Sequence, residues 1–350
     1  MNEKKRITIG VTILVGLSLS LTSLLGMTIG AQAGSPSERP DRIALRPQAE
    51  GAWSTEGWVP IGPGQTLTFT HSVGGDPALY AVDLWFLDTG PVNYGINQIA
   101  YGGVEDNGVH YGAYWWGLTD TQINVTRETG DLFVDQVFLR IREPDPPDWD
   151  SGWLDIDPGV ANILTLNHNL GGNEEDYRVG IKFRDSDADG LGIHQYNIGG
   201  NEDSNRFYGA AWLNLTNSSL HVLRFGNDIY ADQVRVFINL PDSPPAFDSG
   251  WSDFALGQTQ VISHNLDINP FAYVISTSQR SPQHGINIMG VGGIELHGQY
   301  RGSDWESMTG QTISLSRMAQ DIYAPEMRVR IWTPNYIFLP SVTGDYSPPD

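Results

Sequence analysis

Apolar and polar residues alternate in short runs through most of the chain after residue 50. In residues 177–184 every second side chain is large and apolar, which is the period of a β-strand with one buried face. Gly, Asn and Asp separate such runs, and no helical period competes with them. The clearest alternations lie at residues 164–166, 177–184, 220–222, 234–238 and 327–331. The pattern predicts an all-β protein almost without helix.

A set of landmarks occurs three times, about 95 residues apart. Each copy has a Gly-Trp pair, a His 13 to 15 residues later, and a second Trp that stands 12 residues before an Arg and 16 before an Asp. The sets are Trp58, His71, Trp115, Arg127 and Asp131; Trp153, His168, Trp212, Arg224 and Asp228; and Trp251, His264, Trp305, Arg317 and Asp321. Solenoid repeats have shorter periods of roughly 20–50 residues. We therefore expect three tandem antiparallel β-sandwich domains, each with about seven strands and its own core.

Proline-rich joints mark the domain boundaries. Residues 143–148 and 240–245 are short, acidic and rich in proline, so they predict stiff linkers between neighbouring domains. The expected sandwiches span residues 51–143, 148–240 and 246–334, with a spacer at 34–50 before them and a tail at 335–350 after them. On this reading, the second unit folds alone.

The first 33 residues have the pattern of an export signal. Lys4-Lys5-Arg6 is a basic segment, residues 7–30 are apolar, and Ala31-Gln32-Ala33 is a small-x-small cleavage signal. We expect a secreted or cell-surface protein. The apolar run is long enough to span a bilayer, so a membrane contact is expected only if this segment is not cleaved.

The net charge limits the classes of partner, and the cysteine content limits how the domains can be stabilised. The formal net charge is −21 and the chain has no cysteine. A strongly acidic chain is a poor partner for nucleic acid, and domains without disulfides must be held by core packing alone. Only one lysine, Lys182, follows the apolar segment, so nearly all of the remaining positive charge is arginine.

Polar side chains share one position in the three copies and are candidates for ligand binding. Asn97, His194 and Asn287 each follow a Gly-Ile pair. Side chains that both donate and accept suit hydroxyl recognition, although they suit a plain solvent face equally well. Aromatic rings near them would serve for stacking on a sugar, and Trp116 stands where the other copies have Leu213 and Glu306. The full set of candidate ligand-binding residues is Asn97, Gln98, Tyr114, Trp116, His194, Gln195 and Asn287.

One loop of the second copy has the composition of a calcium site. Asp185, Asp187 and Asp189 alternate before Gly190, and carboxylate oxygens are the ligands that Ca²⁺ prefers. The loop has Tyr196 where an EF-hand has its last Glu, so a complete EF-hand is excluded. A Ca²⁺ ion in the second copy and a solvated turn both remain open, and no cofactor is required.

No catalytic signature stands out. Asp88-Thr89-Gly90, Asp150-Ser151-Gly152 and Asp248-Ser249-Gly250 match the triplet of aspartic proteases, but they do not occupy equivalent places in their copies. The marked residues are triplicated, whereas catalytic groups are normally singular. We therefore expect no enzyme.

Several short motifs of the third copy resemble the H-type lectin domain, the module of snail agglutinins and discoidins. They are the Gly-Trp opening, His264-Asn265-Leu266, the Asn269-Pro270 step into Tyr273-Val274, and the closing Ile331-Trp332. The resemblance implies a six- or seven-stranded antiparallel sandwich that binds galactose-type sugars and often assembles as a trimer. The family's sugar-contacting loop has no clear counterpart, because residues 224–228 occupy its place, so no binding residue is carried over.

The sequence thus predicts a secreted, non-catalytic carbohydrate-binding repeat protein whose partners are glycans or a cell-surface polysaccharide. The alternative is a structural or adhesive spacer protein without a small-molecule ligand. Assembly into a homo-oligomer stays open.

Overall fold

The computed structural model describes residues 52–143, 146–187, 190–203, 206–296 and 299–333. The predicted export signal, spacer and tail lie outside these residues. Within the described ranges, no helix has the length and apolar character needed to cross a membrane.

Each repeat contributes one larger antiparallel sheet of five strands. In the first repeat it consists of β1 (Ala52–Ser54), β10 (Gln136–Arg142), β4 (Ala81–Asp88) and β5 (Gly95–Asn97), with β2 (Val59–Pro60) also paired to β10. In the second it consists of β11 (Trp149–Asp150), β20 (Gln233–Asn239), β14 (Arg178–Asp185) and β15 (Gly192–His194), with β12 (Leu154–Asp155). In the third it consists of β21 (Phe247–Asp248), β30 (Glu326–Trp332), β24 (Val274–Ser281) and β25 (Gly285–Asn287), with β22 (Ser252–Asp253).

Each repeat adds a three-stranded sheet, a hairpin and one or two short 3-10 turns. The three-stranded sheets are β3 (Thr66–Thr70), β9 (Gln122–Arg127) and β8 (Ala113–Trp116); β13 (Leu164–Asn167), β19 (Ser219–Arg224) and β18 (Ala210–Leu213); and β23 (Thr259–Ser263), β29 (Thr312–Arg317) and β28 (Ser303–Glu306). The hairpins are β6–β7 (Val104–Asp106, Val109–Tyr111), β16–β17 (Asn201–Asp203, Arg206–Tyr208) and β26–β27 (Ile294–Leu296, Gln299–Arg301). The turns are η1 (Pro77–Leu79), η2 (Val160–Asn162), η3 (Glu174–Asp176) and η4 (Pro270–Ala272).

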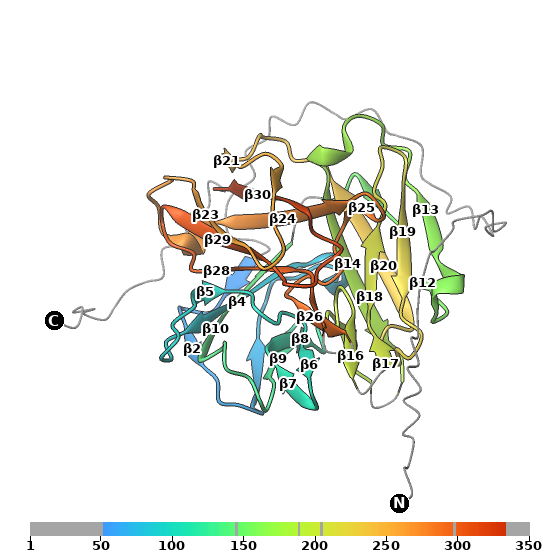
Figure 1. Ribbon diagram of the computed structural model, residues 1–350. Helices are drawn as coiled ribbons and strands as arrows, with labels where there is room; N and C mark the ends of the chain where they lie inside the picture. Colours follow the sequence, from blue (N-terminus) through green and yellow to red (C-terminus); the bar gives the residue numbers. More distant parts are fainter. Residues whose placement is uncertain (1–51, 144–145, 188–189, 204–205, 297–298, 334–350) are drawn as a thin grey trace, which may run out of the picture.

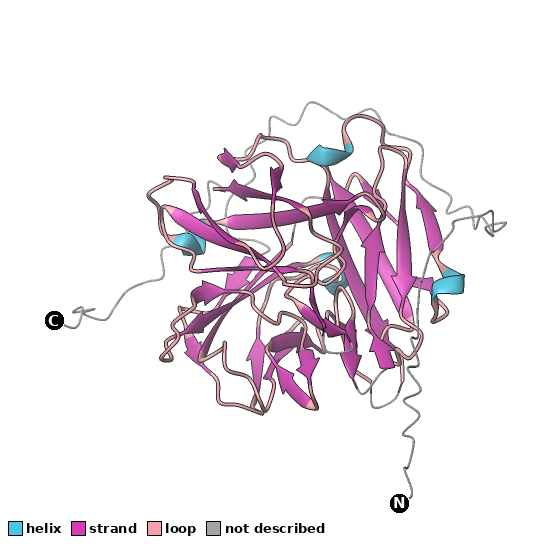
Figure 2. Cartoon of the chain, in the orientation of Figure 1, coloured by secondary structure: helices cyan, strands magenta, loops and turns pink. Residues whose placement is uncertain are grey.

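The six main sheets form a six-bladed β-propeller of small antiparallel sheets around one centre (Figure 1). Strands make up nearly all of the regular structure (Figure 2), so the all-β prediction is confirmed. The prediction of three tandem sandwiches is wrong, and so is the resemblance to the H-type lectin domain. The reason is that the repeats do not have separate cores: one cluster joins the first and second repeats, and another joins Trp85 and Phe138 of the first to the third.

Backbone hydrogen bonds close the repeats into a ring. We call the contacts between repeats the 1–2, 2–3 and 3–1 seams. At each seam the residue after β5, β15 or β25 donates its N–H to a tryptophan carbonyl of the neighbouring repeat. These bonds are Gln195 to Trp115 (3.3 Å), Ile288 to Trp212 (3.1 Å) and Gln98 to Trp305 (3.0 Å). Because the third repeat bonds to the first, the three repeats form a closed ring.

Glycines allow the three repeats to meet at the centre. Asn197 N–H donates to the Gly102 carbonyl at 2.8 Å, Gly290 to Gly199 at 2.9 Å, and Ala100 to Gly292 at 2.8 Å. A Cβ on Gly199 would lie 2.8 Å from the Ile288 carbonyl oxygen, and one on Gly292 would lie 2.7 Å from the Tyr101 nitrogen. Both glycines also have positive φ. The repeated Gly-Gly pairs are therefore required by close backbone packing.

A buried arginine or lysine side chain bridges each seam. Its N–H groups donate to backbone carbonyls at the end of the 3-10 turn of the neighbouring repeat, because these carbonyls have no hydrogen-bond partner within the turn. Arg140 bonds Phe271 (2.9 Å) and Tyr273 (2.6 Å) at the 3–1 seam, and Arg330 bonds Glu175 (2.8 Å) and Tyr177 (3.0 Å) at the 2–3 seam. At the 1–2 seam Phe237 stands in place of the arginine, and Lys182 of the adjacent strand bonds Ala78 (2.8 Å) and Tyr80 instead.

These contacts bury both faces of the central strands. Strand β14 confirms the alternation in residues 177–184, with Ile181 and Phe183 in the core. Its other face was expected to meet solvent, yet Lys182 is only 2% exposed because the first repeat covers it. Alternation alone does not distinguish a face covered by water from a face covered by a neighbouring repeat.

Candidate functional site

The candidate residues that follow the Gly-Ile pairs lie inside the protein. Asn97, His194 and Asn287 are each 0% exposed. Asn97 donates to the Phe133 carbonyl at 3.2 Å, His194 shares a hydrogen bond with the Tyr230 carbonyl at 2.8 Å, and Asn287 donates to the Tyr323 carbonyl at 3.3 Å. Their hydrogen-bonding groups are occupied by the chain itself, and they join β5, β15 and β25 to a loop of the same repeat.

The two glutamines lie on the seams. Gln98 accepts the indole N–H of Trp305 at 2.9 Å and donates to the Leu84 carbonyl at 2.8 Å. Gln195 accepts from Trp115 at 3.1 Å and from Tyr101 at 2.7 Å. The corresponding residue of the third repeat is Ile288. These side chains join one repeat to the next.

The two aromatic candidates are half-buried in the first repeat. The Tyr114 ring lies 4.3 Å from the Tyr196 ring across the 1–2 seam, and burial raises the pKa of its hydroxyl. The Trp116 indole donates to the Thr126 hydroxyl at 2.9 Å. The structure therefore brings Tyr114 to the 1–2 seam, where Gln195 also lies, but not to Asn97 or Asn287.

The acidic loop of the second repeat forms a hydrogen-bonded turn. Asp185 accepts backbone N–H groups from Asp187 at 3.1 Å and Leu191 at 3.0 Å, while Asp232 accepts from Ser186. Oxygen atoms of Asp185, Asp187 and Asp232 lie within 4.8 Å of one another. Asp189 lies outside the described residues. In the first repeat Asp88 and Asp135 make the same kind of bonds, so turn formation accounts for Asp185 and Asp232 without an ion.

The Asp-Ser-Gly triplets form turns that present a tryptophan. Gly250 has φ 64° and its N–H donates to Asp248, which also binds Arg328. The hydrogen bond from Arg328 lowers the pKa of the Asp248 carboxyl, which keeps it charged. Trp251 follows, with the Arg280 guanidinium 4.5 Å from its ring centre. The triplet thus has a structural role in placing Trp251.

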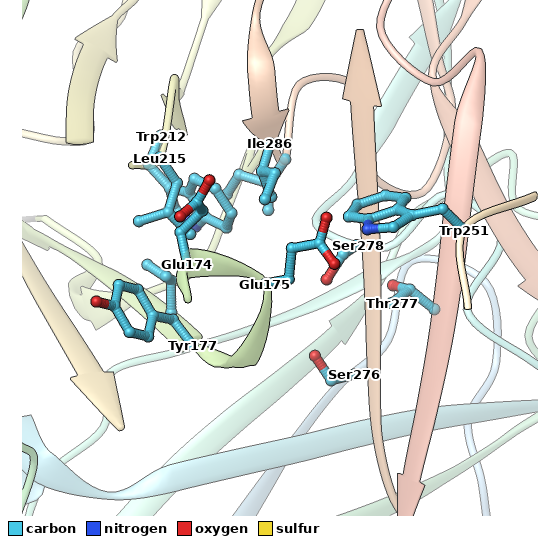
Figure 3. Close-up of a pocket in the computed structure, with 12 residues that line it drawn as sticks. Glu174, Glu175, Tyr177, Trp212, Leu215, Trp251, Ser276, Thr277, Ser278 and Ile286 are labelled. Atoms are coloured by element: carbon cyan, nitrogen blue, oxygen red, sulfur yellow. The ribbon is translucent and has the colours of Figure 1, made fainter. Parts of the chain in front are cut away.

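Trp251 borders a cavity of about 50 Å³ at the 2–3 seam. Its walls combine aromatic and aliphatic side chains with three hydroxyl residues and two carboxylates (Figure 3). The polar lining consists of Glu174 and Glu175 from the second repeat and Ser276, Thr277 and Ser278 from the third. The apolar lining consists of Tyr177, Val179, Trp212, Leu215, Trp251, Ile286 and Ile288.

Small side chains leave room for this cavity, whereas aromatic rings fill the corresponding place at the 3–1 seam. There the Phe271 ring lies 4.5 Å from Phe138 and 5.4 Å from Trp58, and Trp85 contacts Trp305. The alignment of the repeats places Glu175 at the position of Phe271, Ser278 at that of Trp85 and Arg328 at that of Phe138.

Arginines hold the acidic side of the cavity. Glu175 pairs with Arg280 at 3.0 Å and with Arg328 at 3.4 Å. Figure 3 shows its carboxylate pointing toward Trp251 and Ser278. The described part of the chain supplies no ion pair for Glu174, so this carboxylate is available as an acceptor.

One polar atom at the cavity has no partner. The Trp251 indole nitrogen is buried, and its N–H makes no hydrogen bond within the described residues. A buried donor left without an acceptor costs about 1–3 kcal/mol. The arrangement can therefore bind a group that accepts from Trp251 and donates to a carboxylate.

The sequence analysis did not identify this site. The sequence does show that Glu175 and Ser278 differ from their counterparts in the other repeats. This difference does not show that the two residues, which belong to different repeats, face one another.

No protein-family model, curated protein or solved structure matches the chain. The resemblance to H-type lectins therefore rests on short motifs alone, and the arrangement of the sheets contradicts it.

Proposed function

We propose that this protein is an exported, non-catalytic carbohydrate-binding protein whose ligand enters the cavity at the 2–3 seam. The observation that carries the proposal is the unpartnered indole N–H of Trp251 beside hydroxyl and carboxylate groups. Sugar hydroxyls both accept and donate hydrogen bonds, so one hydroxyl of a ligand can accept from Trp251 while another donates to Glu174. The rings of Trp212 and Trp251 offer apolar surface for the C–H face of a sugar.

The carboxylates favour binding over hydrolysis. Glycosidases normally need two carboxylates, one of which acts as an acid. Glu175 is held by two arginines, which favour its charged form, so Glu174 alone remains for proton transfer. A single available carboxylate suits recognition of a hydroxyl group.

The cavity size favours one substituent of a larger glycan over a complete monosaccharide. We expect weak binding to each sugar unit, with a Kd of about 1 mM, or roughly −4 kcal/mol. The 3–1 seam does not offer an equivalent site, since aromatic rings fill the corresponding place there.

Two substitutions test the site on a glycan array. Ser278→Trp places at the 2–3 seam the residue that the first repeat has at this position, and we expect it to abolish retention. Trp251→Phe keeps a ring and removes one hydrogen bond of about 1 kcal/mol, so we expect about fivefold weaker binding.

The matched control is Trp153→Phe, at the corresponding position of the second repeat, where Arg184 covers the ring at 4.1 Å. It should bind as the unchanged protein does. If the unchanged protein binds no glycan of a broad panel, the carbohydrate proposal fails and the spacer or adhesive function replaces it.

A further inference from the structure

Strand β28 carries two carboxylates on the face of its sheet opposite the core residue Trp305, at the 3–1 seam. Asp304 and Glu306 are two positions apart, so their side chains lie on the same face. The corresponding residues are Tyr114 and Trp116 in the first repeat and Ala211 and Leu213 in the second. Only the third repeat has acidic residues there.

Asp304 is buried although it has no counter-charge. Its side chain belongs to a residue that is 8% exposed, and its Oδ1 atom has no hydrogen-bond partner within the described residues. Those residues also provide no basic group in an ion pair with either Asp304 or Glu306. An ionised carboxylate in this position costs several kcal/mol unless a positive charge compensates it.

Hydroxyl groups surround the two carboxylates. Strand pairing places Ser316 opposite Asp304 and Ser314 opposite Glu306, and the Ser316 hydroxyl also contacts that of Thr259 at 2.8 Å. The face therefore gathers carboxylate and hydroxyl oxygens, which are the ligands of a hard cation such as Ca²⁺.

The first repeat covers this face. Ile96 of the first repeat bridges to Met308, and the Tyr94 carbonyl accepts the N–H of Ser307 at 2.9 Å. Burial raises the pKa of the Tyr94 hydroxyl, and the charges of Glu306 and Asp304 raise it further. The two carboxylates thus lie where the last repeat meets the first.

We propose that Asp304 and Glu306, with the hydroxyls of Ser314 and Ser316, bind a calcium-type cation that reinforces closure of the ring at the 3–1 seam. Protonation would also neutralise Asp304, and burial does raise the pKa of this carboxyl to about 8. However, a proton on Asp304 would leave Glu306 without a compensating charge among the described residues. A cation satisfies Oδ1 and also offsets the charge of the half-buried Glu306.

Thermal melting of the full-length chain with and without Ca²⁺ tests the proposal. At a Ca²⁺ concentration about a hundredfold above Kd, we expect a Tm rise of roughly 5 °C or more. Asp304→Asn keeps the shape and removes the charge, so it should abolish the rise. Asp187→Asn alters the acidic loop of the second repeat and should leave the rise unchanged.

Terbium luminescence gives a second measurement that does not depend on stability. Because the Tyr94 hydroxyl interacts electrostatically with Glu306 and Asp304, we expect this ring to excite a bound lanthanide, with emission from the unchanged protein and its loss in Asp304→Asn. If Asp304→Asn does not fold, Glu306→Gln serves in its place, with a weakened response expected.

Three outcomes would overturn the proposal. One is a Ca²⁺ response that persists in Asp304→Asn and disappears in Asp187→Asn. Another is the absence of any response to Ca²⁺ or Mg²⁺. The third is a set of two results: Tm of the unchanged protein falls between pH 4 and pH 8 and does not respond to cations, and this fall is absent in Asp304→Asn. Together they would identify a proton as the group that neutralises Asp304.

Discussion

Arg140→Met tests whether the 3–1 seam closes the ring. Arg140 is 2% exposed and makes three hydrogen bonds: one to Asp83 at 2.8 Å and two to the carbonyls of Phe271 and Tyr273. Methionine retains most of the apolar stem but removes every donor. The two carbonyls are then left without their donor, at about 1–3 kcal/mol each.

The expected loss is about 3–5 kcal/mol, which lies within the sum for the two buried carbonyls at about 1–3 kcal/mol each. Asp83 contributes little to this figure because Arg142 still binds it at 3.0 Å. For a folded unit of this size we expect a Tm decrease of roughly 10 °C. Urea unfolding and thermal melting of the full-length protein measure both quantities.

Arg142→Met is the matched control. Arg142 binds the same carboxylate, but the described residues show no bond from it to another repeat. Its removal should cost about 1 kcal/mol or less. If the two variants lose the same stability, the bonds across the seam contribute nothing measurable and the ring is not held as described.

Three further predictions concern pH, modularity and the acidic loop. Burial lowers the pKa of His194 to about 4, and the hydrogen bonds of His194 to Tyr196 and Tyr230 suit the neutral ring. The neutral ring therefore contributes fully to stability above about pH 6.5, and about 3 kcal/mol is lost as the pH falls through 4. His194→Asn should flatten this part of a profile of stability against pH. A fragment of residues 148–240 exposes two seams, so sedimentation and circular dichroism should find it unfolded or self-associated; a folded monomer would contradict the shared core. Asp187→Asn should change stability by less than about 0.5 kcal/mol in urea unfolding, because Asp187 is exposed, and a larger loss would indicate a bound ion in the loop.

The sequence alone predicted the presence of the main strands and the threefold repeat. The alternation at 234–238 predicts a buried strand, and Val234, Val236 and Ile238 of β20 are each 0% exposed. The predicted number of about seven strands in each repeat was too low, since each repeat has ten. The hairpin strands and the two-residue strands are too short to give a recognisable period in the sequence.

The closure of the ring could not be predicted, because a linear period does not fix how the copies meet. Gln98 and Gln195 were named as candidate ligand-binding residues, yet the partner of Gln98 is Trp305, far away in the sequence. The cavity was hidden for a similar reason, since Glu175 and Ser278 come from different repeats. Residues that contact each other across repeats leave no local pattern.

Joining three repeats in one chain has a consequence for how the molecule can diverge. In a ring of three identical subunits, any substitution appears at all three contacts, so a cavity at one would open all of them and weaken the whole assembly. Covalent linkage removes this constraint. Phe271 and Trp58 can keep one seam densely packed while Ser278 leaves space at another, and the acidic pair on β28 can appear once. Two contacts that retain stability thus leave the remaining one free to change toward a ligand.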